Sequence, residues 1–179
     1  LEFRRVLFRS GKMAEEIERR FLVVPDFNPE KFSYKSVNIA QSYLPHTGSW
    51  TIRVRREESR ENIRHIVTMK LAVSGMTNKE YEHEITPEEY KDILSSCYSH
   101  IEKTRHYIKA GERTWEVDVY KDETVDPRIL AEIELASEDE NLKLPEWIAR
   151  EITGDRYYSN HQIAERLTKA DRRSKPPIS

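Results

Sequence analysis

Residues 15–24 read EEIERRFLVV, a stretch in which charged and apolar side chains alternate. Alternation with a period of two is typical of a β-strand with two unlike faces. Side chains two residues apart on a strand point to the same side and lie about 7 Å from each other. Glu16, Glu18 and Arg20 therefore share one face, while Phe21 lies on the other. The stretch predicts a strand with one charged face and one largely apolar face.

The same alternation recurs along the chain and predicts a fold built mainly from β-strands. Seven further strands are expected, at residues 36–45, 50–57, 62–72, 79–86, 101–109, 113–121 and 128–137. Turn-forming residues such as glycine and serine separate several of them, at residues 46–49, 73–78 and 110–112. The chain contains neither an internal repeat nor a linker between two halves, so we expect a single folded domain.

Three helices are expected beside these strands. The first covers about residues 87–98, because Thr86 is a suitable N-cap and a proline follows it at the first helical position. The second follows Pro145 in the sequence PEWIAREIT, and the third runs from Ser159 to about Lys169. Many strands with a few helices indicate the α+β class.

The polar face of several predicted strands repeats a charge of one sign. Basic pairs are Arg53 with Arg55 and Lys103 with Arg105, and acidic sets are Glu80 with Glu82 and Glu84, Glu116 with Asp118, and Glu132 with Glu134. Like charges this close are destabilising unless opposite charges lie among them. One such face is usually solvated, but the repetition makes a charged interior an equal alternative. If these strands closed into a barrel, the charges would lie inside and the apolar faces outside, beneath helices. Such an interior binds polyanions through basic side chains and divalent cations through carboxylates.

The overall composition excludes several other classes of protein. The chain has 179 residues, of which 35% are charged, yet its formal net charge is only −2. This balance argues against strong binding of nucleic acid or of an acidic membrane surface. The longest apolar run, FLVV at 21–24, is far shorter than the ~20 residues of a membrane-spanning helix. Cys97 is the only cysteine, which excludes a disulfide scaffold and favours a reducing compartment, the cytoplasm.

The first residues of the chain, LEFRRVLFRSGK, differ in pattern from the remainder of the sequence. Arginines interrupt their apolar residues, so they lack the continuous apolar stretch of a signal peptide. We therefore expect residues 1–12 to be a non-native, adapter-like segment. The rest divides into one domain over residues 13–170 and a flexible tail over residues 171–179.

The segment EIERRFLV at residues 16–23 resembles the opening of the CYTH family, also called the triphosphate tunnel metalloenzymes, whose signature is ExExK. Further segments that resemble the family follow in order over residues 13–170: QSYL, TGSWTIRVR, TMK, KEYEHEI, KTRHYI, WEVDVY, LAEIELAS and LPEWIAREITGDRYYSNHQIA. One residue departs from the signature, because Arg20 stands where the family has lysine. Arginine can grip a phosphate with two parallel hydrogen bonds but does not lose its proton. Phosphate binding is therefore expected of Arg20, and proton transfer is not.

The resemblance implies an eight-stranded antiparallel β-barrel with flanking and C-terminal helices, whose tunnel binds a triphosphate. The implied metal ligands are Glu16 and Glu18, joined by Glu132 and Glu134 on the opposite wall, and the implied metal is Mg²⁺ or Mn²⁺. The implied substrate-binding residues are Arg20, Arg53, Arg55, Lys70, Lys103 and Arg105, with Glu82 beside them and Glu80 and Glu84 as helpers. Asp118 would orient basic groups or a metal-bound water, and the implied catalytic residues are Glu16, Glu18, Arg20 and Asp118.

The implied reaction is hydrolysis of the terminal phosphate of inorganic tripolyphosphate, with slower hydrolysis of nucleoside triphosphates. The short chain and the QSYL segment resemble the inorganic triphosphatases most. Thiamine triphosphatase, class IV adenylate cyclase and a non-catalytic polyphosphate-binding module stay open as alternatives, as does an interaction barrel whose charges face solvent. The expected partner is a triphosphate-containing small molecule, with no nucleic acid and no membrane, and the expected state is a monomer or homodimer.

Overall fold

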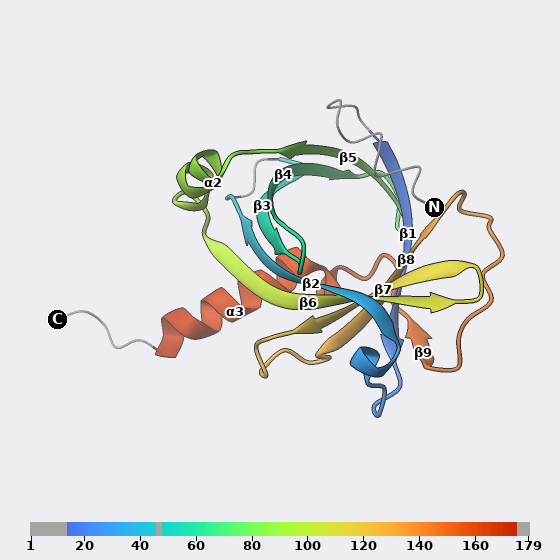
Figure 1. The fold of residues 1–179 in the computed structure, drawn as a ribbon. Helices are drawn as coiled ribbons and strands as arrows, with labels where there is room; N and C mark the ends of the chain where they lie inside the picture. The colour runs from blue at the N-terminus through green and yellow to red at the C-terminus, as the bar shows by residue number, and fades with distance from the viewer. Residues whose placement is uncertain (1–13, 46–47, 175–179) are drawn as a thin grey trace.

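The computed structural model describes residues 14–45 and 48–174 (Figure 1). All eight expected strands are present. They are β1 Ala14–Val23, β2 Ser33–Tyr43, β3 Trp50–Glu58, β4 Ile63–Ala72, β5 Thr77–Glu84, β6 Ser99–Ala110, β7 Arg113–Tyr120 and β8 Ile129–Leu135. The adapter-like residues 1–12, residues 46–47 of one expected turn and residues 175–179 of the expected tail lie outside the described residues.

The eight strands close into an antiparallel β-barrel, which confirms the expected fold class (Figure 1). Neighbouring strands follow the order β5-β4-β3-β2-β6-β7-β8-β1, and β5 also pairs with β1. The closing contact is short: it runs from Ala14 opposite Glu80 to Ile17 opposite Thr77. Because side chains alternate along every strand, the charged columns face one side of the barrel wall and most apolar residues face the other.

A ninth strand stands where the second helix is expected. The sequence PEWIAREIT forms a turn followed by β9, Ile148–Glu151, which pairs antiparallel with β1 around Phe21. β5 covers this edge of β1 only as far as Ile17, so the backbone groups near Phe21 need other partners. β9 supplies them, while Trp147 packs against the apolar cluster below. The helix prediction is wrong because the unpaired edge of β1 outweighs the local helical pattern.

The other two expected helices form, with shifted ends. α2 spans Pro87–Leu94, and Thr86 and Glu89 cap it reciprocally, since each side chain accepts a hydrogen bond from the other's backbone N–H. It ends earlier than expected, and Cys97 lies in the tighter turns that follow, donating its N–H to the carbonyl of Leu94. α3 spans Asn160–Ser174 and so continues past the expected end. Neither these helices nor the short 3₁₀ helices η2 (Pro29–Lys31) and η3 (Arg156–Tyr158) within the described residues could span a membrane.

The outer face of β1, β7 and β8 carries the first apolar cluster. Phe21, Trp115 and Val117 are completely buried there. Their cover is the connection between β8 and β9 together with Phe27 and Trp147, whose rings stack at 4.6 Å. The expectation that helices cover the outside of the barrel is therefore wrong for this cluster, since aromatic residues from loops replace them.

A second apolar cluster lies under α3, which packs against β6 (Figure 1). Tyr43, Tyr120 and Leu130 of the barrel are buried beneath Ile163 and Ala164 of the helix. These three barrel residues lie at the end of the tunnel where β2 and β7 finish. α3 thus covers one end of the barrel and leaves much of its outer wall exposed.

Candidate active site in the barrel tunnel

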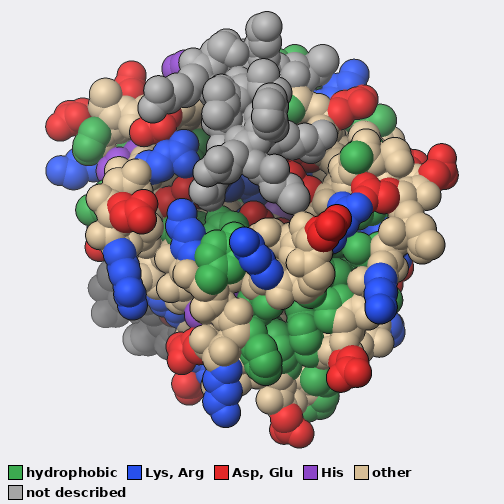
Figure 2. Space-filling view, turned by 45° about the vertical axis from the view of Figure 1, so that its right-hand side comes forward, with side chains coloured by type: hydrophobic (Ala, Val, Ile, Leu, Met, Phe, Trp, Pro, Cys, Tyr) green, Lys and Arg blue, Asp and Glu red, His purple; other side chains and the backbone are tan. Residues whose placement is uncertain are grey.

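The interior of the barrel is a cavity of about 2170 Å³ whose wall includes side chains from all eight barrel strands. Of the expected site residues, the following line it: Glu16, Glu18, Arg20, Arg53, Arg55, Lys70, Glu82, Lys103, Arg105, Glu132 and Glu134. The remaining one, Asp118, is on the same face of the sheet as Arg105, which it pairs with, but it is 1% exposed and does not line the cavity. The charged columns thus face the tunnel, whereas acidic and basic side chains are interspersed around a hydrophobic area on the outer face in Figure 2.

Three carboxylates from β1 and β5 surround one ammonium group in the tunnel. Lys70 Nζ lies 3.6 Å from a carboxylate oxygen of Glu16, 3.5 Å from one of Glu18 and 3.4 Å from one of Glu80. Burial and a hydrogen bond with Glu80 raise the pKa of Glu16 to about 9. Arg53 is a second basic group in contact with Glu80, so three carboxylates meet two basic side chains here.

The carboxylates of β5 also hold the arginines of β3. Arg53 Nη2 donates to Glu80 at 3.2 Å, and Arg55 Nη2 donates to Glu82 at 2.8 Å. Glu80, expected only as a helper, is 1% exposed and contacts both Arg53 and Lys70, so it is more central than Glu82. The sequence could not rank these acids because they share one face of one strand and differ only in depth along the tunnel.

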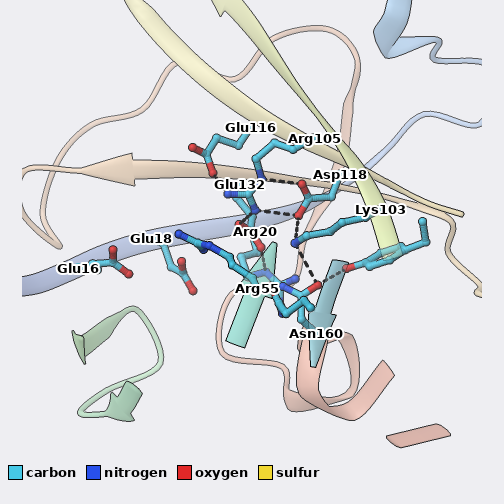
Figure 3. Close-up of polar contacts among 12 residues, drawn as sticks. Glu16, Glu18, Arg20, Arg55, Lys103, Arg105, Glu116, Asp118, Glu132 and Asn160 are labelled. Atoms are coloured by element: carbon cyan, nitrogen blue, oxygen red, sulfur yellow. Dashed lines mark hydrogen bonds and ion pairs between the residues drawn. The ribbon is translucent and has the colours of Figure 1, made fainter. Parts of the chain in front are cut away.

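Two arginines place unsatisfied donors in the tunnel. Arg20 Nε donates to Glu132 at 2.9 Å, and Figure 3 shows the two side chains side by side. Nη2 of Arg20 and Nε of Arg53 are buried and have no hydrogen-bond partner in the part of the chain that the structure describes. A buried donor without an acceptor costs about 1–3 kcal/mol. These atoms favour a ligand rich in acceptor oxygens, such as phosphate.

The carboxylates of β8 lie beside those of β1 and not across the tunnel from them. In the pairing of the two strands, Glu134 is opposite Glu18 and Glu132 is opposite Arg20. The prediction that Glu132 and Glu134 occupy the opposite wall is therefore wrong. The first and last of the eight barrel strands are neighbours in the closed ring, which the order of strands along the chain does not reveal. As a result, the acids of β1 and β8 form one continuous acidic wall.

Asp118 of β7 binds two basic side chains of the neighbouring strand β6 (Figure 3). Its carboxylate accepts hydrogen bonds from Lys103 Nζ at 2.5 Å and from Arg105 Nε at 2.7 Å. Arg105 also donates to Glu132 at 3.0 Å and to Glu116. Burial opposes the ionisation of Asp118, but the charges of Arg105 and Lys103 outweigh it and lower the pKa of this carboxyl. Through these contacts Asp118 can orient Lys103 and Arg105.

Lys103 connects this network to the C-terminal helix. Burial lowers the pKa of Lys103 to about 8, even though Asp118 stabilises the ammonium form. Its Nζ also donates to Asn160 Oδ1 at 3.3 Å, and the same oxygen accepts from Tyr120 Oη at 2.8 Å. Asn160 was not among the expected site residues, and the only sequence signal for it was the family-like segment RYYSNHQIA.

The segment around residues 153–165 closes the tunnel at this end. It lines the cavity with side chains that include Asn160 and His161, and the His161 ring packs on Tyr43 at 5.0 Å. Gly154 has a φ of 77° and lies so close to Gly75 that a Cβ at Gly154 would be 3.2 Å from the Cα of Gly75. This approach seats the closing segment against the turn between β4 and β5.

The acidic wall offers oxygen ligands for a cation. Among the described residues, no three Asp, Glu, His or Cys side chains converge as a ready metal site. Glu16 and Glu18 instead surround the ammonium of Lys70, and together with Glu80 they are three carboxylates against two basic side chains, Lys70 and Arg53. Carboxylate oxygens are the donors that hard divalent cations prefer. The donor atoms present are therefore of the kind that suits such a cation.

The model of the CYTH domain family matches residues 14–167, from the start of β1 into α3. The chain belongs to the CYTH family. This match confirms the resemblance seen in the sequence. It also covers every residue described above as part of the tunnel, Asn160 included.

Two relatives of this CYTH protein are named inorganic triphosphatase. The one from Acetivibrio thermocellus is 35% identical over 155 residues, which cover 86% of this chain and 95% of the relative. The one from Nitrosomonas europaea is 30% identical over 154 residues, which cover 83% and 96%. A crystal structure of an inorganic triphosphatase matches with a TM-score of 0.55 and 29% identity, over 83% of this chain and 97% of the other.

Proposed function

We propose that this CYTH protein hydrolyses the terminal phosphate of inorganic tripolyphosphate. The proposal is carried by the two buried guanidinium nitrogens, Arg20 Nη2 and Arg53 Nε, that lack a partner within the described residues. They share the cavity wall with Lys70 and Arg55. A chain of phosphates would supply both the acceptor oxygens and the negative charge that these donors require. The activity for which the two relatives are named supports the same conclusion.

The basic side chains bind and orient the substrate in this mechanism. Arg20 comes from β1, Arg53 and Arg55 from β3, and Lys70 from β4, so a linear triphosphate between them meets donors from more than one side. Arg105 reaches in from β6, and Asp118 of the neighbouring strand β7 holds it. Donors fixed before the reaction stabilise the charge that develops on the transferred phosphoryl group.

We also propose that the enzyme uses Mg²⁺ or Mn²⁺, with Glu16 and Glu18 of β1 and Glu132 and Glu134 of β8 as the residues that hold it. When bound, such a cation neutralises phosphate charge and lowers the pKa of a water molecule that attacks the terminal phosphorus. Because water is the nucleophile, the chain needs no covalent nucleophile of its own. The carboxylates of β1 and β8 are adjacent in the sheet, which supports a shared cation.

Phosphate release from tripolyphosphate tests this function. With Mg²⁺ or Mn²⁺, the wild-type protein should produce phosphate and pyrophosphate, and removal of the metal with EDTA should stop the reaction. Glu18→Gln should lower kcat/KM at least about tenfold, since it removes one charge from the acidic wall. Glu15→Gln changes the exposed carboxylate next to Glu16, on the opposite face of β1, and should leave the rate unchanged. A wild-type rate no higher than that of Glu18→Gln would overturn the proposal.

The same assay with other substrates separates the alternatives. We expect slower phosphate release from ATP than from tripolyphosphate. Formation of cyclic AMP from ATP would instead indicate an adenylate cyclase, and preferential hydrolysis of thiamine triphosphate a thiamine triphosphatase. Tight binding of tripolyphosphate without turnover in either metal would indicate a polyphosphate-binding module.

A further inference from the structure

The two ends of the tunnel differ in their chemistry. Residues 153–165 close one end, where β6 begins. The strand register places the first part of β2 and the last part of β6 at the other end, because Lys35 is opposite Tyr107 while Tyr43 is opposite Ser99. From β2 and β6, Tyr34, Lys35, Tyr107 and Lys109 line the cavity at this second end, beside Arg113 and Thr114 of β7. The two tyrosines and two lysines of β2 and β6 form a tyrosine–lysine rim.

The rim places two ammonium groups over two aromatic rings. Lys109 Nζ lies 5.3 Å from the centre of the Tyr34 ring, and Lys35 Nζ lies 5.9 Å from that of Tyr107. Both distances are in the range of cation–π contacts. Neither lysine forms an ion pair within residues 14–45 and 48–174, whereas the basic side chains deeper in the tunnel are bound by carboxylates. The rim therefore presents two ammonium groups that no carboxylate of the described residues contacts at ion-pair distance.

Tyr34 also exposes a large aromatic surface at the cavity wall. The residue is 57% exposed, unlike Tyr43 and Tyr120 at the closed end of the tunnel, which are 2% and 0% exposed. A flat ring of this kind gains free energy when another ring covers it. Its position at the wall of the cavity makes a ligand inside the tunnel the natural partner.

The size of the cavity leaves room for such a ligand. Pockets for small molecules usually measure about 300–1,000 Å³, and this cavity, at about 2170 Å³, is larger. Successive side chains on one face of a strand are about 7 Å apart. Along β6 these are Lys103, Arg105, Tyr107 and Lys109, so two phosphate-binding positions are followed by the rim. A triphosphate bound at the arginines could therefore carry a group that reaches the rim.

We propose that the tyrosine–lysine rim is a subsite for the base of a nucleoside triphosphate whose phosphates lie among the tunnel arginines. The inference rests on the proposed function, because it assumes that the arginines bind the phosphate chain. Tyr34 stacks on one face of the base. Lys35 and Lys109 attract the phosphate nearest the ribose. Stacking on tyrosine tolerates every base, so the subsite discriminates little among them.

The charge of the rim also selects against thiamine triphosphate. Its thiazolium ring carries a fixed positive charge, and two ammonium groups at the same place repel it. A neutral nucleobase meets no such repulsion. The rim therefore favours nucleoside triphosphates over thiamine triphosphate as organic substrates of this tunnel.

Binding of ATP and of tripolyphosphate to the full chain, measured by calorimetry without divalent metal, tests the subsite. Tyr34→Ala should raise the Kd for ATP roughly 5- to 150-fold, the range found when an aromatic partner of a base is removed, and should leave the Kd for tripolyphosphate within about twofold. Tyr34→Phe keeps the ring and should bind ATP as the wild type does. Tyr157→Ala removes a tyrosine of similar exposure, 53%, that does not line the cavity, and should change neither Kd.

The outcomes separate the subsite from the proposed function. If Tyr34→Ala weakens both ligands equally, or if the wild type does not bind ATP, the subsite is wrong, whatever the turnover of tripolyphosphate. If Tyr34→Ala weakens ATP alone but the wild type does not hydrolyse tripolyphosphate, the proposed function is wrong and the subsite stands. The double change Lys35→Ala with Lys109→Ala should narrow the difference in affinity between ATP and thiamine triphosphate, and an unchanged difference would contradict the role of the rim charge.

Discussion

Lys103 donates a hydrogen bond to Asp118 at 2.5 Å, and both residues are 1% exposed. Asp118 binds Arg105 in the same way, so one carboxylate holds the two basic side chains that β6 offers to the tunnel. Removing one member of a buried pair leaves the other charge without compensation. The arrangement of these two basic side chains in the tunnel therefore depends on a buried carboxylate that does not itself line the cavity.

Asp118→Ala should lower the free energy of unfolding by about 3–5 kcal/mol, the usual cost of removing one partner of a buried ion pair. Urea denaturation at neutral pH, followed by circular dichroism, measures this loss. Glu151→Ala is the matched control, because it removes the carboxylate that binds Arg19 at 2.6 Å on the exposed outer face. That exposed pair should contribute no more than about 1 kcal/mol. Equal losses of unfolding free energy in the two variants would show that Asp118 contributes no more to stability than an exposed ion pair.

The buried position of Lys103 predicts that tripolyphosphate binding depends on pH. Its pKa is lowered to about 8, so the side chain is a cation below that pH and neutral above it. The charged groups that face it are Asp118 and Arg105, with Glu132 farther away. The affinity for tripolyphosphate, measured by calorimetry at constant ionic strength, should therefore fall as the pH rises through about 8.

Lys103→Arg provides the control for this titration. Arginine stays charged throughout the range, so the variant should lose the fall in affinity near pH 8 while still binding at pH 7. Parallel pH profiles for the two proteins would show that another group titrates. Lys35→Arg, a change at a half-buried lysine of the rim, should retain the wild-type profile.

Arg20, in place of the family lysine, should act through its charge and hydrogen bonds. Arg20→Met should lower kcat/KM for tripolyphosphate by roughly 10- to 150-fold, the value of a hydrogen bond to a charged group. Arg20→Lys keeps the charge but loses the planar fork, so its loss should stay within about tenfold. The same two changes at Arg19, which points outward to Glu151, should have little effect. A large gain in kcat for Arg20→Lys would show that proton transfer at this position matters.

The strands were predictable because their signal is local. Alternation around Arg53 and Arg55, for example, depends only on the period of a pleated strand. Pairing is not local, and this explains the errors. Ile148 belongs to a strand because β1 has an unpaired edge, and Glu134 lies beside Glu18 because the barrel closes. Neither relation can be inferred from the spacing of residues along the chain.

The site was predictable in its residue types and less so in its details. Charged columns such as Glu132 with Glu134 indicated the interior, and the family resemblance assigned them roles. Depth along the tunnel decided the rest: Glu80 is central although it carries the same charge as its neighbours. Asn160 joins the site only because α3 begins at the end of the barrel, where its side chain meets Lys103. The only sequence signal for Asn160 was the family-like segment RYYSNHQIA, because a single polar residue at a helix start has no spacing pattern of its own.

The closure of the tunnel by the C-terminal segment predicts one specific difference between two glycines. Gly154 and Gly111 both have a positive φ, 77° and 62°, so alanine at either position is strained by about 1–2 kcal/mol. At Gly111 a Cβ would meet no atom within 4 Å, whereas at Gly154 it would lie 3.2 Å from the Cα of Gly75. Gly154→Ala should therefore destabilise the protein more than Gly111→Ala in urea denaturation. It should also increase hydrogen exchange at the start of α3, because that segment must move away from Gly75 to relieve the contact. Equal destabilisation by the two changes, with unaltered exchange in α3, would mean that the approach of Gly154 to Gly75 does not hold the tunnel closed.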